Sequence, residues 1–468
     1  MTLNLDQTLA WTKSLAAHTP DAAAELAMLN DLQGNILKGH GRGHTINFFL
    51  AFDKAQHPAA RRFISELGAD VTTALDQLTG AQVFKATGKS ASPFMTLLLT
   101  ADGYRALGIE DVMPPGQAFA DGMQNRQLND PPQAQWDPGL SGDIHALLII
   151  GASSAQDQSA LQAEFTQRFA ASGGAVRLLT VELGKSLCNR DKNGIEHFGY
   201  VDGRSQPLAL QEDVDLEARN GGIDQWDPAI PLSQLLVKCP GGQLDVSCGS
   251  YFVFRKLEQN VQGFKRREIE LAEILPGAGE RAGASVVGRF ENGTPVSASA
   301  TEIPVAKPGP AGVPNNFNFS DDAAGLKCPF AGHVRKTNPR TDTGDSKDHL
   351  MARRGIPYGD RTDDPNDGIL ANKPTGGVGL LFMAYQRDLE NQFEFTQRFW
   401  VDNKDFRNPG AGIDPILGQP PGAGPQRYPK VYGVSLSESF DFSGFVTMRG
   451  GAYFFAPSVS FFKRLGAR

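Results

Sequence analysis

Apolar residues in the first half of the chain gather in short continuous runs, each six to eight residues long. Runs of this length between small and polar residues are typical of buried strands. After the third run, Ala155–Ala171 carries apolar residues at helical spacing, which predicts an amphipathic helix. Strands that alternate with helices predict an α+β fold with helices on one face of a sheet. The predicted strands are Thr45–Phe52, Phe94–Leu99, His145–Ala152 and Val176–Leu183.

The same pattern recurs after about residue 205. The length of 468 residues exceeds one ordinary domain of about 100 to 200 residues, so two α+β units are expected. We predict an N-terminal extension at 1–27, a first unit at 28–205 and a second unit at 206–468. Phe445–Ala456 is expected to form two short strands about its Gly-Gly pair. The other predicted elements of the second unit are a strand at Ser250–Lys256, a helix at Arg267–Leu275, a strand at Gly377–Tyr385 and a helix at Asp388–Trp400.

Composition narrows the classes of partner and the compartment. The chain has 45 Lys and Arg against 52 Asp and Glu, a net charge of -7, which argues against nucleic acid or an anionic membrane as the main partner. Its four cysteines include no CxxC pair, so we expect free buried thiols, although pairing of Cys239 with Cys248 stays open. The N-terminus lacks a basic leader, and no apolar run reaches the roughly 18 residues of a spanning helix. These features predict a cytoplasmic protein.

Two segments rich in Gly, Pro and Asn, Ile303–Lys327 and Tyr358–Thr375, interrupt the second unit. They are too long for ordinary connections, and such loops are usually functional or disordered. Between them lie HVRKTNPRTD, from His333, and HLMARRGIPYG, from His349. This polar and basic stretch is one of two places where we look for chemistry.

The other place is FGYVDGRSQP, where Asp202 stands between two glycines. Taken alone, the motif favours a tight turn, because glycine and aspartate suit turn conformations. Its neighbours Phe198, Tyr200 and Val201 are apolar, however, and a partly buried carboxylate needs a partner. Asp202 is therefore a candidate acid as well as a turn residue.

A histidine and an arginine pair supply the other candidates. His333 follows Ala331 and Gly332 and precedes several basic residues. A lone histidine is more often structural than a ligand, but this setting suits an iron porphyrin, with the imidazole on the metal and Arg335 near an anionic propionate. The Arg353-Arg354 pair is either solvated or includes an arginine that faces an acid across a small cavity.

Together, FGYVDGRSQP, CPFAGHVRKTNPR and ARRGIPYG resemble the motifs of the dye-decolorising peroxidase family, whose hallmark is GxxDG. GLLFMAYQ at 379–386 and GIDPILGQ at 412–419 extend the resemblance. It covers nearly the whole chain from about residue 28 and points to the longer fungal and bacterial members of the family.

The resemblance implies a pair of ferredoxin-like α+β domains of the dimeric α+β barrel type. It also implies one haem b (iron protoporphyrin IX) per chain, held in the C-terminal domain. By motif position, His333 is the expected proximal ligand of the iron and Asp202 the distal acid. Arg353 is the expected distal arginine, whereas Arg354 occupies a variable position of the motif.

Further positions take expected roles from the same resemblance. Leu380 and Phe382 match apolar residues that narrow the distal pocket, although both also suit a core strand. Asp414 matches the carboxylate that accepts the proximal imidazole N–H, although an aspartate before proline also suits a turn. Tyr358 and Trp400 match positions implicated in electron transfer at surface radical sites, with simple packing as the alternative.

The implied activity is that of a haem peroxidase. It reduces hydrogen peroxide through an oxoferryl intermediate and oxidises dyes, phenols or other aromatic donors, partly through surface radical sites. The alternatives are a non-catalytic haem carrier, a protein that releases haem iron, and a metal-free binding domain. The physiological donor and the oligomeric state stay open at this stage.

Overall fold

A sheet of ten strands forms the centre of the computed structural model, which describes residues 3–88, 93–305, 307–419, 424–434 and 437–467. These strands are β1 (His44–Phe52), β2 (Phe94–Leu99), β3 (Ala146–Ala152), β4 (Val176–Lys185), β7 (Val237–Lys238), β8 (Cys248–Gln259), β9 (Ala352–Arg353), β10 (Ile356–Tyr358), β11 (Gly379–Gln386) and β14 (Val446–Ala456). Their order is β7–β8–β14–β2–β3–β1–β4–β10–β11–β9, and an additional pairing joins β8 to β11. The eight strands from β8 to β11 in that order therefore form a closed ring.

Each half of the chain contributes four strands to the ring in the same order. The first half gives β4–β1–β3–β2 and the second half gives β14–β8–β11–β10, so both follow the ferredoxin-like order 4-1-3-2. The halves join where Phe455 pairs with Leu99 and where Tyr358 pairs with Gly184, both in antiparallel register. The prediction of two ferredoxin-like α+β units is confirmed.

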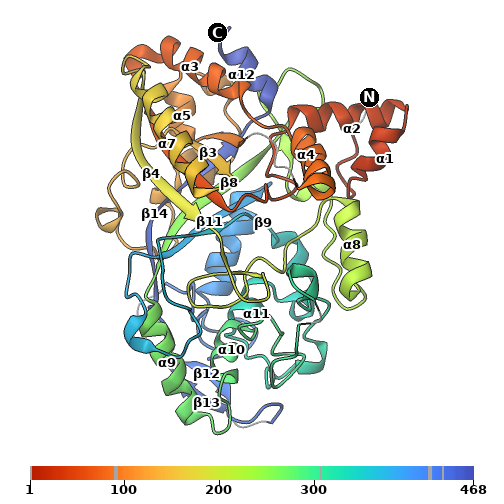
Figure 1. The fold of residues 1–468 in the computed structure, drawn as a ribbon, viewed down its shortest axis with the longest axis vertical. Helices are drawn as coiled ribbons and strands as arrows, with labels where there is room; N and C mark the ends of the chain where they lie inside the picture. The colour runs from red at the N-terminus through yellow and green to blue at the C-terminus, as the bar shows by residue number, and fades with distance from the viewer. Residues whose placement is uncertain (1–2, 89–92, 306, 420–423, 435–436, 468) are drawn as a thin grey trace.

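Helices lie around the ring and within the long connections between its strands (Figure 1). The α-helices are α1 (Trp11–Ala16), α2 (Pro20–Asp31), α3 (His57–Ala69), α4 (Ala74–Thr87), α5 (Ala101–Ala106), α6 (Gln117–Asp121), α7 (Ala155–Ala170), α8 (Gln211–Gly221), α9 (Val261–Ile274), α10 (Arg281–Val287), α11 (His333–Thr337) and α12 (Val459–Leu465). Two π-helices, η11 (Leu389–Glu394) and η12 (Thr396–Val401), follow β11. Two small sheets each contain one strand pair, β5 (Leu187–Cys188) with β6 (Gly194–Ile195) and β12 (Gln426–Pro429) with β13 (Ser437–Phe440). The short 3-10 helices are η1 (Lys54–Gln56), η2 (Glu110–Val112), η3 (Met123–Asn125), η4 (Gln133–Gln135), η5 (Leu232–Gln234), η6 (Pro310–Gly312), η7 (Ser320–Asp322), η8 (Arg340–Asp342), η9 (Ser346–His349) and η10 (Leu370–Asn372).

The predicted strands and helix of the first half are confirmed within two residues at each end. The side chain of Ser154 accepts a hydrogen bond from the Asp157 N–H at 3.1 Å, which caps α7 at its N-terminus. Phe165 and Phe169 on α7 then pack on Phe48 of β1, with ring centroids 6.1 and 5.2 Å away. Figure 1 shows α3, α5, α7 and α12 at one end of the molecule, and α9, α10 and α11 at the other.

Two predictions in the second half were wrong in detail. Phe445–Ala456 contains one strand, β14, which pairs with β8 on both sides of a bulge between Met448 and Gly450. Gly450 has φ +142°, and a Cβ there would lie 2.5 Å from Leu140, so this glycine shapes a bulge and not a turn. The helix predicted at Arg267 begins at Val261 instead, because Asn260 caps its first turn.

The predicted extension at 1–27 is tied to the rest of the fold. Leu9 and Trp11 belong to the apolar core cluster that also contains Met28 of α2 and Phe49 of β1. Cys239, Cys248 and Cys328 are buried and free, as expected, whereas Cys188 is free and exposed. No helix in the described part of the chain is long and apolar enough to cross a membrane.

Candidate active site

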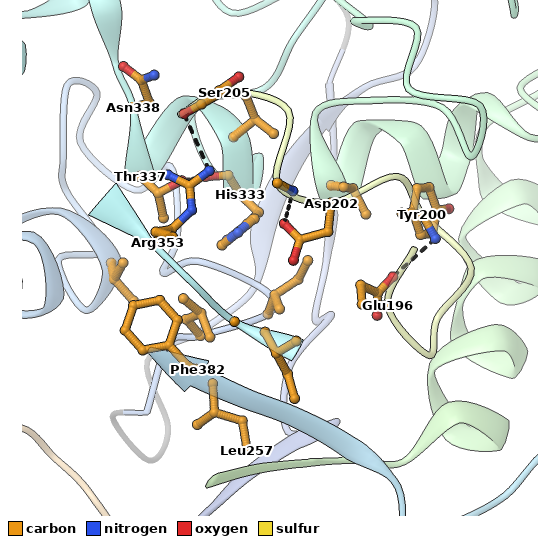
Figure 2. Close-up of a pocket in the computed structure, with 18 of the residues that line it drawn as sticks. Glu196, Tyr200, Asp202, Ser205, Leu257, His333, Thr337, Asn338, Arg353 and Phe382 are labelled. Atoms are coloured by element: carbon orange, nitrogen blue, oxygen red, sulfur yellow. Dashed lines mark hydrogen bonds between the residues drawn. The ribbon is translucent and has the colours of Figure 1, made fainter. Parts of the chain in front are cut away.

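A cavity of about 230 Å³ lies where the FGYVDG segment meets α11, β9, β11 and η12. Figure 2 shows Asp202, Arg353 and His333 around it, from three segments that are far apart in the sequence. Leu380 and Phe382 are two residues apart on β11 and so face the same side of the sheet, where both line the cavity. The cavity thus combines an acid, a guanidinium and an imidazole with apolar walls.

The loop that carries Asp202 is a turn, and it also exposes the Asp202 carboxylate to the cavity. Gly199 and Gly203 have φ +98° and +76°, and a Cβ on Gly199 would lie 2.0 Å from the side chain of Asn366. The Asp202 N–H donates to the carbonyl of Gly194 at 3.0 Å. The carboxylate accepts a bond from the Gly203 N–H at 2.6 Å and is exposed to the cavity. The two interpretations of this motif therefore hold together.

Glu196, six residues earlier, holds this loop and was not identified from the sequence. Its carboxylate accepts from the backbone N–H groups of Phe198 and Tyr200, at 2.7 and 3.0 Å, and from Gln259 at 2.5 Å. Burial, with a smaller contribution from the nearby charge of Asp202, raises the pKa of Glu196 to about 7 although these hydrogen bonds lower it. The sequence signal that could have identified Glu196 is an acid two residues before Phe198, the apolar start of FGYVDG.

The raised pKa of Glu196 predicts a pH-dependent contribution to stability. The folded protein holds a proton that the unfolded chain loses near pH 4.5, so this contribution is complete below about pH 4.5 and is lost as the pH rises through about 7. The loss amounts to at most about 3 kcal/mol, because the side chain is only half-buried. Urea unfolding at pH 5 and pH 7.5 should show a smaller pH difference for Glu196→Gln than for the wild type. Exposed Glu164→Gln should keep the wild-type difference, and an equal difference in both variants would contradict the assignment.

Arg353, and not Arg354, faces the cavity. The Arg353 N–H donates to Gln206, and its Nη2 donates to the Ser205 carbonyl at 3.3 Å. Burial lowers the pKa of Arg353 and the charge of Asp202 opposes that shift, which places the two charges in each other's field. Arg354 points away, because successive strand residues alternate, and it donates to the carbonyls of Asn35 and Ile36.

His333, at the start of α11, is held by a buried carboxylate. Its Nδ1 lies 2.8 Å from Oδ2 of Asp414, and Oδ1 of Asp414 accepts from the N–H groups of Ile416 and Leu417. Burial alone would lower the pKa of His333, but the Asp414 charge outweighs it and the pKa is raised. Nδ1 therefore carries the proton that it donates to Asp414, which leaves Nε2 as the nitrogen available in the cavity.

A second histidine, His349, also lines the cavity, but it is less suited to bind a metal. Its Nδ1 donates to the carbonyl of Asn391 at 2.5 Å, and its Nε2 lies 3.6 Å from Asp345. The ring stacks on Phe395 at 3.7 Å, which further fixes its plane. His333 is thus the better candidate ligand of the two.

The expectation that Arg335 meets a propionate was wrong. Arg335 lies two residues after His333 on α11, about 200° around the helix, so its side chain points away from the cavity. The guanidinium is fully buried between Asp322 and Asp342, at 3.0 and 2.6 Å. This side chain is a structural ion pair.

Two other buried arginines, Arg289 and Arg340, are held in a different way. Both are buried, both donate to Ser205 and Asn315, and neither forms an ion pair with a carboxylate in the described part of the chain. Burial lowers the pKa of Arg289 to about 9, and Arg289 lines the cavity. The sequence signal was an arginine at the end of an apolar run with no acid three or four residues away.

These residues fit the iron porphyrin expected from the motifs. His333 offers Nε2, and the apolar walls suit a flat apolar macrocycle. Arg289 lines the cavity without a carboxylate partner among the described residues, which suits the anionic edge of that macrocycle. A buried cation without a counter-charge is costly, so an anion beside Arg289 would remove a penalty that the protein alone retains.

Tyr358 and Trp400 are not at the surface, contrary to the expectation of surface radical sites. They are 7% and 3% exposed. The Tyr358 hydroxyl has no hydrogen-bond partner among the described residues, and the Lys256 ammonium lies 4.9 Å from its ring centroid. Trp400 contacts the ring of His349 edge-on, with centroids 5.0 Å apart, so it lies one ring behind the cavity wall.

Comparison with known proteins gives consistent matches along the chain. The family described as Dyp-type peroxidase, C-terminal, matches residues 226–409. The multifunctional dye peroxidase DyP2 of an Amycolatopsis species is 42% identical, over 99% of this chain and 100% of that protein, and its solved structure superposes with a TM-score of 0.90. The DyP-type peroxidase of an Anabaena species has a TM-score of 0.88 and 38% identity, over 95% and 96% of the two chains. A dye-decolorizing peroxidase solved with 2,6-dimethoxyphenol has a TM-score of 0.76 and 27% identity, over 94% and 99%.

Proposed function

The chain belongs to the dye-decolorising peroxidase family of haem enzymes, and we propose that it reduces hydrogen peroxide in the cavity between Asp202, Arg353 and His333. Dyes and phenols are the proposed electron donors, as the names and complexes of its relatives suggest. The observation that carries the proposal is one cavity that contains an acid, an arginine and an imidazole held by a buried carboxylate.

Three parts of the chain would hold the cofactor. His333 would bind the iron through Nε2, and Arg289 and Arg340 would face the propionates. Leu380 and Phe382 would limit which molecules enter the cavity. Haem, when bound, supplies a metal that accepts peroxide and stores oxidising equivalents. The two guanidinium groups have no carboxylate partner among the described residues, which supports this orientation, since the propionates would neutralise them.

Asp202 and Arg353 would have different roles in the cleavage of peroxide. The Asp202 carboxylate can take a proton from one peroxide oxygen and return it to the departing oxygen, as a general acid–base group does. Arg353 keeps a fixed positive charge and directs N–H groups at the negative charge that develops as the O–O bond breaks. Among the described residues, Nη2 makes the only hydrogen bond of this guanidinium, to Ser205, which leaves donors for peroxide.

Asp414 acts through His333. By holding Nδ1–H it orients the ring and makes Nε2 more basic, which favours higher oxidation states of a bound metal. We expect Asp414→Asn to lower peroxidase turnover by roughly tenfold to a hundredfold, since outer ligand partners have effects of that size. Steady-state assays at a matched Soret absorbance would measure this. Asp322→Asn, which changes a buried carboxylate bonded to Arg335 instead, should retain turnover per bound haem, and equal losses in both would contradict the role.

The proposed function is tested on the purified full-length protein supplied with haem. We expect a Soret band and peroxide-dependent oxidation of both an anthraquinone dye and 2,6-dimethoxyphenol. A Soret band without oxidation would favour a haem carrier. The appearance of fluorescent metal-free porphyrin would favour iron release, and absence of any Soret band would reject a haem protein altogether.

We further propose that the active site lies between the two predicted units, 28–205 and 206–468. Asp202 would come from the end of the first, and His333 and Arg353 from the second. The cytoplasmic location stays a prediction.

A further inference from the structure

Tyr200 lines the cavity and is bonded to a carboxylate that faces away from it. The tyrosine is 3% exposed, and its hydroxyl donates a hydrogen bond to Oε1 of Glu268 on α9. Figure 2 shows Tyr200 on the same side of the cavity as Asp202, with Glu196 bonded to its backbone N–H. Position 283 must be small, because a Cβ on Gly283 of α10 would lie 2.1 Å from the Tyr200 hydroxyl and 2.2 Å from Glu268. The pair therefore packs closely against α10, and only 13% of the Glu268 side chain is exposed.

A chain of charges leads from this pair to the surface. Lys265 lies 3.1 Å from Glu268 and 2.7 Å from Glu291, whose side chain is 29% exposed. The Lys265 ammonium also lies 5.0 Å from the Tyr200 ring centroid. Burial raises the pKa of Glu268, which makes this carboxylate a better proton acceptor than an exposed one.

This setting distinguishes Tyr200 from the other tyrosines. Of the eight in the chain, only Tyr200 and Tyr453 donate their hydroxyl to a carboxylate in the described residues. Tyr453 lies at a separate, smaller cavity, and the Tyr358 hydroxyl has no partner among those residues. Tyr200 alone thus combines contact with the active-site cavity and a built-in proton acceptor.

The charges around Tyr200 determine how it can be oxidised. Removal of one electron from a phenol gives a cation that is strongly acidic, and the Lys265 charge beside the ring disfavours that cation. If the phenolic proton moves to Glu268 as the electron leaves, the product is a neutral phenoxyl group beside a neutral acid, and no new charge is buried.

We propose that Tyr200 is a redox residue of this enzyme, which gives one electron to the haem after peroxide has oxidised it, while the phenolic proton passes to Glu268. This inference rests on the proposed peroxidase function. One O–H bond of Tyr200 breaks and one forms on Glu268. A phenolic donor then returns an electron to the phenoxyl oxygen, and Glu268 returns the proton. Tyr200 would extend oxidising capacity towards Glu291 for donors too large to enter the cavity.

The test is electron paramagnetic resonance of the haem-loaded protein, frozen within a second of adding one equivalent of peroxide without donor. Ring-deuterated tyrosine identifies which part of the signal is tyrosyl. We expect Tyr200→Phe to lower the tyrosyl signal at least fivefold while the Soret band and circular dichroism stay unchanged. Tyr453→Phe, the other carboxylate-bonded tyrosine, and Tyr358→Phe should both retain it. Glu268→Gln should slow formation of the signal at least fivefold, because the amide does not take up the proton.

Three results would overturn the inference. They are an unchanged signal in Tyr200→Phe, loss of the signal in Tyr358→Phe instead, and absence of any tyrosyl signal in a wild-type protein that consumes peroxide. A wild-type protein that binds no haem or leaves peroxide unconsumed would instead reject the proposed function itself, so the two failures are distinguishable.

Discussion

Replacing Arg353 with leucine is expected to lower kcat/KM for hydrogen peroxide about a hundredfold, the typical effect of removing one preorganised donor from developing negative charge. Leucine keeps much of the side-chain bulk but removes the charge and every N–H group. Because the Arg353 side chain makes one hydrogen bond within the described part of the chain, to the Ser205 carbonyl, the fold loses little. Stopped-flow measurement of the haem absorbance change after peroxide addition would isolate this step from donor oxidation.

The chain supplies a matched control in the next residue. Arg354→Leu removes an equal charge, but one that donates to Asn35 and Ile36 away from the cavity. It should reduce stability more than the rate with peroxide. Asp202→Asn should also slow the peroxide step, by roughly a hundredfold, since an amide does not take up the proton. If both cavity variants react with peroxide at the wild-type rate, neither residue takes part in the proposed cleavage.

Replacing His333 with alanine is expected to weaken haem binding about a hundredfold or more and to shift the Soret band. Loss of a residue that only supports a metal ligand costs up to about a hundredfold, and loss of the ligand itself should cost at least as much. Asp414 would lose its imidazole partner and stay buried with an uncompensated charge, which adds a cost in stability. Haem titration followed by absorbance measures the affinity. Added imidazole should restore part of the spectrum, because it can enter the space left by the side chain.

His349→Ala is the control for the ligand assignment, since His349 lines the same cavity. Its ring is held by Asn391 and Phe395, so we expect the Soret band and the haem affinity to stay near those of the wild type. Loss of the spectrum in this variant, with a normal spectrum for His333→Ala, would reverse the assignment.

Local pattern predicted the regular parts of the fold well. The strand predicted at Phe94–Leu99 is present with the same bounds, because a continuous apolar run of that length is buried on both faces of a ring. The helix predicted at Asp388–Trp400 exists, but as two π-helical segments, with Thr396, Gln397 and Val401 on the cavity wall. Periodicity did not reveal the wider turn, which is common near functional sites.

For the candidate site, too, the sequence predicted the position of some residues in the structure and not that of others. The motifs placed Asp202, His333 and Arg353 on the list of candidates, and the structure brings them to one cavity. Arg335 seemed equally suitable from its position near His333, yet helix geometry directs it to Asp322 and Asp342. Direction around a helix depends on neighbours that local sequence does not specify.

By itself, the sequence determined the strand and helix types, the repeated α+β pattern, and the residues whose chemistry suits peroxide and haem, since these follow from apolar periodicity and local motifs. Only the tertiary structure decided that β8 pairs with β11 and closes the ring, and that Arg289 and Arg340 have no carboxylate partner in the part of the chain that it describes. It also places Arg353, and not Arg354, at the cavity. The Tyr200–Glu268 hydrogen bond was also decided by the tertiary structure, since it joins residues 68 positions apart. Such features depend on which distant segments pack together and on which side chains then have a partner, and local sequence carries neither.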